Sequence, residues 1–247
     1  MKSILITGCN RGLGLGLVKT FLNLPKPPKY VFATCRNIEQ AVDLKELGTQ
    51  NDNLHILEID LKHFDAYAKL VTDVSNVVKD DGLNVLFNNA GIASKSTRLN
   101  FVQADSMIDN LTTNTVVPVM MAKAFAPLIN KAAKANDSLP MGLSRAAIIN
   151  MSSILGSIQK NDSGGMYAYR TSKAGLNAAT KSMSLDLKDG KVLCVSIHPG
   201  WVRTDMGGAK APLDVESSTK TMVETLMSMN EAHNGGFFEH NGKPLPW

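Results

Sequence analysis

The sequence predicts an α/β fold in which a doubly wound parallel sheet carries helices on both faces. Three observations predict it. Short apolar segments of strand length alternate with segments of helical periodicity along the whole chain. A glycine-rich turn joins the first strand to the first helix. No repeat or low-complexity segment interrupts this alternation, so one domain spanning residues 1–247 is expected.

Six strands and a shorter final one are expected, at residues 2–7, 30–35, 54–59, 83–87, 146–151, 192–198 and 235–240. The helix after the first strand is marked by apolar residues at helical spacing, Leu13, Leu17, Phe21 and Leu24. A long helix is expected over residues 112–134, another around residues 169–173, and a last one over residues 215–229. Right-handed crossovers then bring the carboxyl ends of the strands to one edge, where ligands bind in such folds.

Composition and charge narrow the function classes. The chain has 247 residues, of which 44% are hydrophobic, enough for a full core. No apolar run approaches membrane-spanning length and no signal peptide precedes the first strand, so a cytoplasmic protein without membrane contact is expected. The net charge of +4 is spread over scattered lysines, which does not favour nucleic-acid binding. The three cysteines lack metal-ligand spacing, so no metal is expected, and they fit a reducing compartment.

A phosphate-binding turn is expected between the first strand and the first helix. Gly8, Gly12 and Gly14 form the pattern G-x-x-x-G-x-G, with Asn10, Arg11 and Leu13 between them. Glycine lets the backbone turn tightly and approach a phosphate, and the helix amino terminus presents free amides to it. The turn therefore predicts a dinucleotide cofactor.

The next strand ends supply further cofactor contacts. The second strand ends at Arg36, where dinucleotide folds place either an acid for the ribose hydroxyls or a base for a 2′-phosphate. Arg36 and Arg11 are the candidates for that phosphate, which predicts NADPH. Asp60, followed by Leu61, is placed to reach the adenine or to cap its turn. Asn89, Ala90 and Gly91 follow the fourth strand and allow close passage of a ligand.

Acid–base chemistry is indicated by Tyr169 and Lys173, which stand four residues apart and so share one helix face. A fixed ammonium beside a phenol pulls the phenol pKa from about 10 toward neutral pH. Such a phenol can give a proton to a carbonyl oxygen or take one from an alcohol. Pro118 removes the amide that would bond the carbonyl of Asn114; by itself this favours a simple kinked helix, and it also leaves that carbonyl free to hold a water.

Together these segments resemble the short-chain dehydrogenase/reductase family over essentially the whole chain. The resemblance implies one Rossmann-type, NAD(P)-binding domain with a tetrad of Asn114, Ser153, Tyr169 and Lys173. Tyr169 would give the proton, Ser153 would bind the substrate oxygen, and Lys173 would also bind the nicotinamide ribose. Asn114 would hold a water through its carbonyl. The resemblance further implies cofactor contacts from the segment after the sixth strand, Pro199, Gly200, Val202 and Thr204. A homodimer through the long helix and the Tyr169 helix is a further expectation.

Two features depart from the family pattern. Tyr167 lies close to Tyr169, but Thr171 stands where its lysine partner should be, so Tyr167 is rejected. The segment from Ser153 to Tyr169 is long, and residues 159–163 are expected to form a polar loop by the pocket. Apolar pocket candidates are Leu155, Met166, Trp201 and Met206.

The expected activity is NADPH-dependent reduction of a ketone, quinone or reactive aldehyde. A pteridine or steroid reductase with the same tetrad is an alternative. A non-catalytic NADP(H)-sensing regulator is a second alternative, from another class. The sequence does not specify the substrate.

Overall fold

The computed structural model describes residues 1–94 and 98–247. Over these residues the chain forms a seven-stranded sheet in the order β3-β2-β1-β4-β5-β6-β7, and each neighbouring pair is parallel. The strands are β1 (Ser3–Ile6), β2 (Tyr30–Cys35), β3 (Leu54–Glu58), β4 (Val85–Asn88), β5 (Ala147–Met151), β6 (Leu193–His198) and β7 (Phe237–Glu239). The predicted doubly wound sheet is confirmed.

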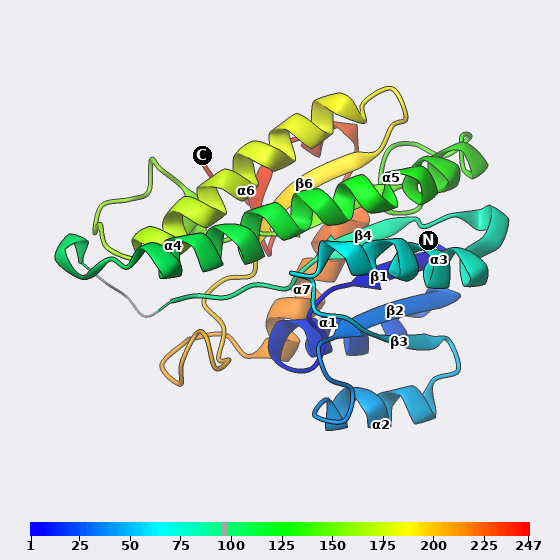
Figure 1. Ribbon diagram of the computed structural model, residues 1–247. Coiled ribbons are helices and arrows are strands. Elements are labelled where there is room, and N and C mark those ends of the chain that lie inside the picture. Colours follow the sequence, from blue (N-terminus) through cyan, green and yellow to red (C-terminus); the bar gives the residue numbers. More distant parts are fainter. Residues whose placement is uncertain (95–97) are drawn as a thin grey trace.

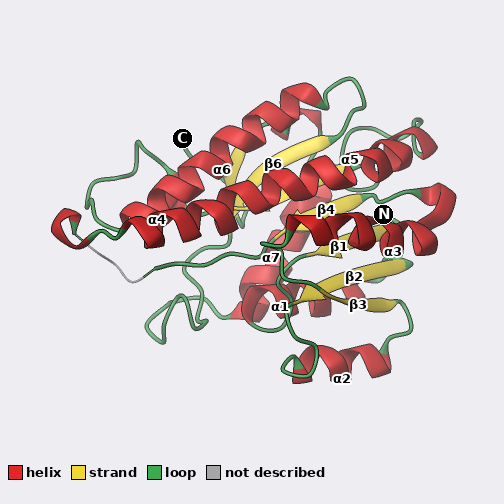
Figure 2. Cartoon of the chain, in the orientation of Figure 1, coloured by secondary structure: helices red, strands yellow, loops and turns green. Residues whose placement is uncertain are grey.

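Helices cover both faces of the sheet (Figures 1 and 2). They are α1 (Gly12–Leu22), α2 (Val42–Gln50), α3 (Tyr67–Val78), α4 (Ala104–Leu111), α5 (Val117–Ala135), α6 (Tyr167–Asp186) and α7 (Val215–Ser228). Helices α1, α2 and α7 contribute to one apolar core, and α3, α5 and α6 contribute to the other. Along β1, Ile4 and Ile6 face the first core while Leu5 faces the second, so both faces of this strand are buried.

The long helix differs from the sequence prediction, which started it at residue 112. In the structure α4, a π-helical turn (Thr112–Val116) and α5 form one continuous helix, Ala104–Ala135. Helix α4 contacts α6 and contributes little to the sheet cores. Its apolar residues Ala104, Met107, Ile108 and Leu111 do stand at helical spacing, a signal that the prediction did not use. Asn114 therefore lies in a π-turn in the middle of a helix, and such turns are frequent at functional sites.

The same helix corrects the statement that no segment approaches membrane-spanning length. Ala104–Ala135 is long and apolar enough to cross a membrane by length and composition, with a mean hydropathy of 1.2 in its most apolar window. Half of that window is buried inside the protein. Met121, Phe125 and Ile129 are fully buried in the second core, so the apolar character is accounted for by packing on the sheet.

The strand order shows at which edge of the sheet a ligand is expected to bind. β1 lies between β2 and β4, so the crossovers leave in opposite directions from this point. In open α/β sheets the crevice at such a switch point, outside the carboxyl ends of the strands, receives ligands. The glycine turn after β1 and residues 89–91 after β4 both lie there, beside Ser153 after β5.

Candidate active site

The glycine turn after β1 is packed too tightly for side chains. A Cβ on Gly14 would come within 2.1 Å of the Gly8 carbonyl oxygen, and a Cβ on Gly8 would lie 2.9 Å from Cα of Ala90. Gly8 and Gly12 also have left-handed φ angles of 70° and 56°. The backbone here is therefore bare and closely drawn against the turn that follows β4.

Side-chain hydrogen bonds hold these two turns together. The hydroxyl oxygen of Thr7 accepts from the backbone amides of Asn89 and Ala90, both at 3.0 Å. The amide of the Asn89 side chain donates to the Thr7 carbonyl at 2.8 Å and to the Gly8 carbonyl at 3.2 Å. Asn89 thus has a structural task that keeps the glycine turn in shape.

The amino terminus of α1 fits a phosphate group. Its capping residue, Arg11, makes no side-chain cap, and no acidic residue stands in the first turn. The helix amides and the helix dipole are therefore left for an anion. Asn10 is exposed beside this terminus, and Leu13 is half-buried. Together with the bare glycine turn, this is a cradle that a diphosphate can enter.

Two arginines flank this cradle. Arg36 follows the last residue of β2 and is exposed. Arg11 is also exposed and forms an ion pair with Asp205, which lies in the segment after β6. Arg11 is therefore partnered across the cleft. Arg36 forms no ion pair among the described residues.

Asp60 caps its own turn. One carboxylate oxygen of Asp60 accepts from the backbone amide of Lys62 at 3.0 Å. The next residue, Leu61, is buried, and its carbonyl accepts from the Tyr67 hydroxyl at 2.6 Å. Of the two roles left open by the sequence, the structure supports the capping role.

The segment after β6 closes on the glycine turn. A Cβ on Gly12 would lie 3.6 Å from the methyl group of Thr204, and the Thr204 hydroxyl accepts from the Gly207 amide at 3.1 Å. The Pro199 carbonyl accepts from the Ser218 hydroxyl at 2.7 Å, which ties this segment to α7. Gly200 is left-handed, with φ 84°, and Val202 is buried. Thr204 thus lies against the glycine turn, whereas Pro199 contacts α7 and Gly200 lies against Leu213 and His240.

Lys173 is buried beside the end of β5. Its ammonium nitrogen donates to the Met151 carbonyl at 2.7 Å and lies 5.8 Å from the centre of the Tyr169 ring. Burial lowers the pKa of Lys173 to about 7. The predicted pair of Tyr169 and Lys173 on one helix face is therefore present, in a poorly solvated setting.

The pKa of Tyr169 differs from the sequence expectation. Burial raises the pKa of the Tyr169 phenol, and a hydrogen bond with the Ser153 side chain lowers it by less. The expected lowering by the neighbouring ammonium is absent, because burial also weakens the charge of Lys173 at neutral pH. Ser153 is itself buried, and its hydroxyl oxygen accepts from the Leu155 amide at 3.2 Å.

The side chain of Asn114 is fully committed to structure. Its oxygen accepts from the Ile92 amide at 2.9 Å, and its nitrogen donates to the Ile92 carbonyl at 2.8 Å and the Ser172 hydroxyl at 2.9 Å. It thereby clamps the segment after β4 to α6. A Cβ on Gly91 would lie 3.1 Å from the Asn114 side-chain oxygen and 3.5 Å from the Lys173 nitrogen. Gly91 thus lies against both tetrad residues.

A hollow of about 340 Å³ opens beside Tyr169. It is lined by Ser94, Phe101, Val102, Gln103, Ser106, Met166, Ala168 and Tyr169. Met166 lines it as predicted, whereas Leu155, Trp201 and Met206 are not among its lining residues. The stretch from Phe101 to Ser106 was missed, because it precedes and begins the unexpected helix α4. Apart from Tyr169 the lining has no ionisable side chain.

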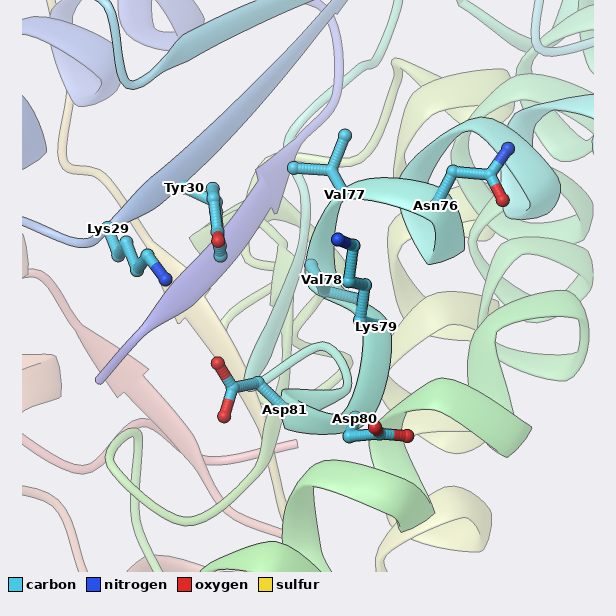
Figure 3. Close-up of a pocket in the computed structure, with 8 residues that line it drawn as sticks. All are labelled: Lys29, Tyr30, Asn76, Val77, Val78, Lys79, Asp80 and Asp81. Carbon is cyan, nitrogen blue, oxygen red and sulfur yellow. The ribbon is translucent and has the colours of Figure 1, made fainter.

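A second hollow, of about 540 Å³, is remote from this chemistry (Figure 3). It is lined by Lys29 and Tyr30 at the start of β2 and by residues 76–81 at the end of α3. Its carboxylates are already paired, Asp80 with Lys131 and Asp81 with Lys2. It lies at the amino-terminal edge of the sheet, where this fold does not place its ligands.

The two features that depart from the family pattern, the polar loop at residues 159–163 and Tyr167, are also placed by the structure. The amide of Gln159 and the hydroxyl of Ser157 both donate to the Trp247 carbonyl, at 3.0 and 3.1 Å. The loop is therefore fastened to the last residue of the described chain. Tyr167 is the first residue of α6 and does not line the 340 Å³ hollow.

Comparison with known proteins agrees with this geometry. The short chain dehydrogenase family matches residues 2–213. The structure of carbonyl reductase Sniffer of D. melanogaster is 65% identical, with a TM-score of 0.99 and full coverage of both chains. The NADPH-bound carbonyl reductase from chicken fatty liver is 37% identical, with a TM-score of 0.95 over 100% of this chain and 99% of that one.

Among curated relatives, the C-signal protein of Myxococcus xanthus is 38% identical over 165 residues, covering 67% of this chain and 93% of its own. The family match extends over most of the chain and includes the glycine turn, Ser153 and the Tyr169–Lys173 pair. This protein is an oxidoreductase that belongs to the short chain dehydrogenase family.

Proposed function

We propose that this chain is an NADPH-dependent carbonyl reductase that acts on a ketone, a quinone or a reactive aldehyde. The observation that carries the proposal is the meeting of Tyr169, Ser153 and Lys173 beside a hollow whose other lining residues are uncharged. A polarised carbonyl compound can enter such a hollow without leaving a buried charge unpaired. The two carbonyl reductase structures support the same reading.

The cofactor residues act by position and charge. Gly8, Gly12 and Gly14 would let the backbone approach the diphosphate, and the amino terminus of α1 would supply amide donors. Arg36 and Arg11 would bind the 2′-phosphate, which a guanidinium can grip with paired hydrogen bonds. Lys173 would bind the nicotinamide ribose, and Val202 and Thr204 would hold the carboxamide.

NADPH, when bound, supplies the hydride that reduces the carbonyl carbon. Ser153 would donate a hydrogen bond to the carbonyl oxygen and so stabilise the negative charge that develops there. Tyr169 would give that oxygen its proton. Its raised pKa keeps the phenol protonated at neutral pH, as an acid must be before it donates. Asn114 would hold a water through its backbone carbonyl and so return protons toward Lys173.

The uncharged hollow also bears on the alternatives. A pteridine or steroid reductase would use the same tetrad, and only the fit of the substrate in about 340 Å³ would separate them. A cofactor-sensing regulator would bind NADPH without consuming it.

Two further features concern the compartment and the assembly of the protein. Three buried free cysteines support a reducing, cytoplasmic setting. The exposed Ala178 on α6 leaves a surface for a homodimer.

The test is NADPH consumption by the purified protein with a panel of quinones, ketones and reactive aldehydes. We expect oxidation of NADPH that depends on the carbonyl compound and is fastest with uncharged apolar members. Binding of NADPH with no oxidation across the panel would contradict the proposal and favour the regulator.

A further inference from the structure

We propose that Arg170 is a positioning residue: its guanidinium holds both ends of the segment 155–163 and, through Leu155, fixes the direction of the Ser153 hydroxyl. The inference rests on the proposed reductase function, since that function gives Ser153 its task at the substrate oxygen. It concerns a residue that neither the sequence motifs nor the tetrad includes.

Arg170 is an unusual buried charge. It follows Tyr169 on α6 and is only 8% exposed, yet among the described residues no carboxylate pairs with it. Its Nε atom has no hydrogen-bond partner. Burying a guanidinium costs free energy unless strong partners compensate. The partners it does have are therefore informative about why it is there.

Those partners lie at the two ends of one segment. One terminal nitrogen of Arg170 donates to the Leu155 carbonyl at 3.4 Å, and the other donates to the Ser163 hydroxyl at 2.9 Å. Between these ends, the Gly156 carbonyl accepts from the Asn177 side chain of α6 at 3.5 Å, and Ser157 and Gln159 donate to the Trp247 carbonyl. Arg98 adds a bond to the Ser163 carbonyl at 3.3 Å, but Arg170 is the side chain that bonds both ends of the segment, and we call this bridge the clip.

The near end of the clip leads directly to Ser153. Leu155, held at its carbonyl by Arg170, donates its own amide to the Ser153 hydroxyl oxygen at 3.2 Å. That bond occupies a lone pair of the hydroxyl and leaves its O–H to donate elsewhere. The turn also sits against α6, since a Cβ on Gly156 would lie 2.8 Å from Cβ of Lys173. Displacement of Leu155 would let the hydroxyl rotate away from Tyr169.

The far end of the clip steadies one wall of the hollow. Ser163 is followed by Gly164, Gly165 and Met166, which all have left-handed φ angles, of 61°, 67° and 51°. A left-handed φ is strained for a side chain such as that of Met166, and within this run the Gly164 amide donates to the Asn161 side-chain oxygen at 3.1 Å. Met166 lines the hollow beside Tyr169. The bond from Arg170 to Ser163 is an anchor immediately before this run.

The chain contains a matched control for Arg170. Arg145 is 7% exposed, donates to the carbonyls of Asp137 and Leu139 at 2.5 and 2.9 Å, and likewise has an unpartnered Nε. It precedes β5, at the opposite edge of the sheet from Ser153. Replacing either arginine removes a buried guanidinium held by a short segment, but only Arg170 touches the segment that positions Ser153.

The experiment compares Arg170→Met, Arg145→Met and the parent. For Arg170→Met we expect kcat to fall about tenfold or more, because a misdirected donor no longer stabilises the substrate oxygen, while the KM for NADPH is unchanged. The alkaline limb of the kcat profile should move to higher pH, since the Ser153 bond that lowers the Tyr169 pKa is weakened. Arg145→Met should lose thermal stability and keep its kcat. Arg170→Lys should recover part of the lost kcat.

A second readout needs no turnover. Lys160 is exposed within the segment, so trypsin should cut there faster in Arg170→Met than in the parent or Arg145→Met. Ser163→Ala keeps the buried Arg170 charge and removes only the hydrogen bond between Arg170 and Ser163. This variant should also be cut faster at Lys160. A parent-like kcat in Arg170→Met, or an equal loss in Arg145→Met, would overturn the proposal. If the parent consumes no NADPH, the proposed function fails, and unchanged cleavage at Lys160 in both variants would then refute the clip separately.

Discussion

The ammonium of Lys173 donates a hydrogen bond to the carbonyl of Met151 across 2.7 Å. This contact joins the catalytic helix α6 to the last residue of β5, two residues before Ser153. One short piece of chain therefore holds the lysine and presents the serine. The contact is buried, and burial brings the pKa of Lys173 from 10.5 down to about 7.

This lowered pKa predicts how stability depends on pH. Between about pH 7 and pH 10.5 the folded state binds fewer protons at Lys173 than the unfolded state, so its contribution to stability rises with pH. Below about pH 7 the folded state carries the full penalty of a buried ammonium. Lys173→Met should therefore gain unfolding free energy over the parent at about pH 6, on the order of a few kcal/mol, and lose this advantage as the pH rises.

The measurement is urea unfolding of cofactor-free parent and variant over this pH range. Taking the difference between the two proteins cancels the titration of groups that do not interact with Lys173. A difference that stays constant with pH would show that Lys173 titrates normally in the folded protein.

The cofactor phosphate can be tested at Arg36. Arg36→Asp should lower kcat/KM for NADPH roughly tenfold to a hundredfold, because hydrogen bonds to charged groups contribute about 1.5–3 kcal/mol. The value for NADH should change little or improve, since repulsion replaces attraction at one phosphate only. The check is kcat/KM with both cofactors. An unchanged ratio would place the phosphate away from Arg36.

Asp205→Asn is the opposite test at the same phosphate. It releases Arg11 from its ion pair, so NADPH should bind more tightly while NADH is unaffected. The gain should stay below about fivefold, because exposed ion pairs contribute only about 0.2–1 kcal/mol. Weaker NADPH binding in Asp205→Asn would mean that the ion pair holds the cleft in its binding shape instead.

The glycine turn predicts a steric effect. Gly14→Ala places a methyl group 2.1 Å from the Gly8 carbonyl oxygen, so the turn must shift. Overpacking of this kind costs about 1–3 kcal/mol, and NADPH affinity should fall by roughly tenfold or more as the cradle moves. Gly190→Ala is the control, since its nearest neighbour would be 3.5 Å away. The measurements are the melting temperature and the Kd for NADPH of both variants. A parent-like melting temperature and a parent-like Kd in Gly14→Ala would contradict the packing described.

The centre of the sheet could be predicted from the sequence because β1, β4, β5 and β6 are buried on both faces and so read as apolar runs. The positions of Gly8, Gly14 and Ser153 at one edge then followed from strand direction alone. Helix α4 was not predicted, although its apolar residues Ala104, Met107, Ile108 and Leu111 stand at helical spacing. The residues from Phe101 to Ser106 that line the hollow were therefore missed too, because they lie just before and at the start of α4.

Tertiary contacts decided the remaining differences. The ion pair of Arg11 with Asp205 joins residues 194 positions apart, and no local pattern announces it. The pKa of Tyr169 was expected to fall because spacing reveals the neighbouring lysine but does not reveal burial. Arg170 reads in sequence as an ordinary helical arginine, and only the fold brings Leu155 and Ser163 to it.

The central claim is that Tyr169 is the proton donor of a reductase, and one comparison tests it most directly. NADPH-dependent turnover of a quinone or aldehyde is measured for the parent, Tyr169→Phe and Tyr167→Phe, with NADPH binding measured in parallel. We expect Tyr169→Phe to bind NADPH as the parent does and to lose roughly 10²–10⁴-fold in kcat, while Tyr167→Phe keeps most of its activity. An active Tyr169→Phe, or an inactive Tyr167→Phe that still binds NADPH, would contradict this account.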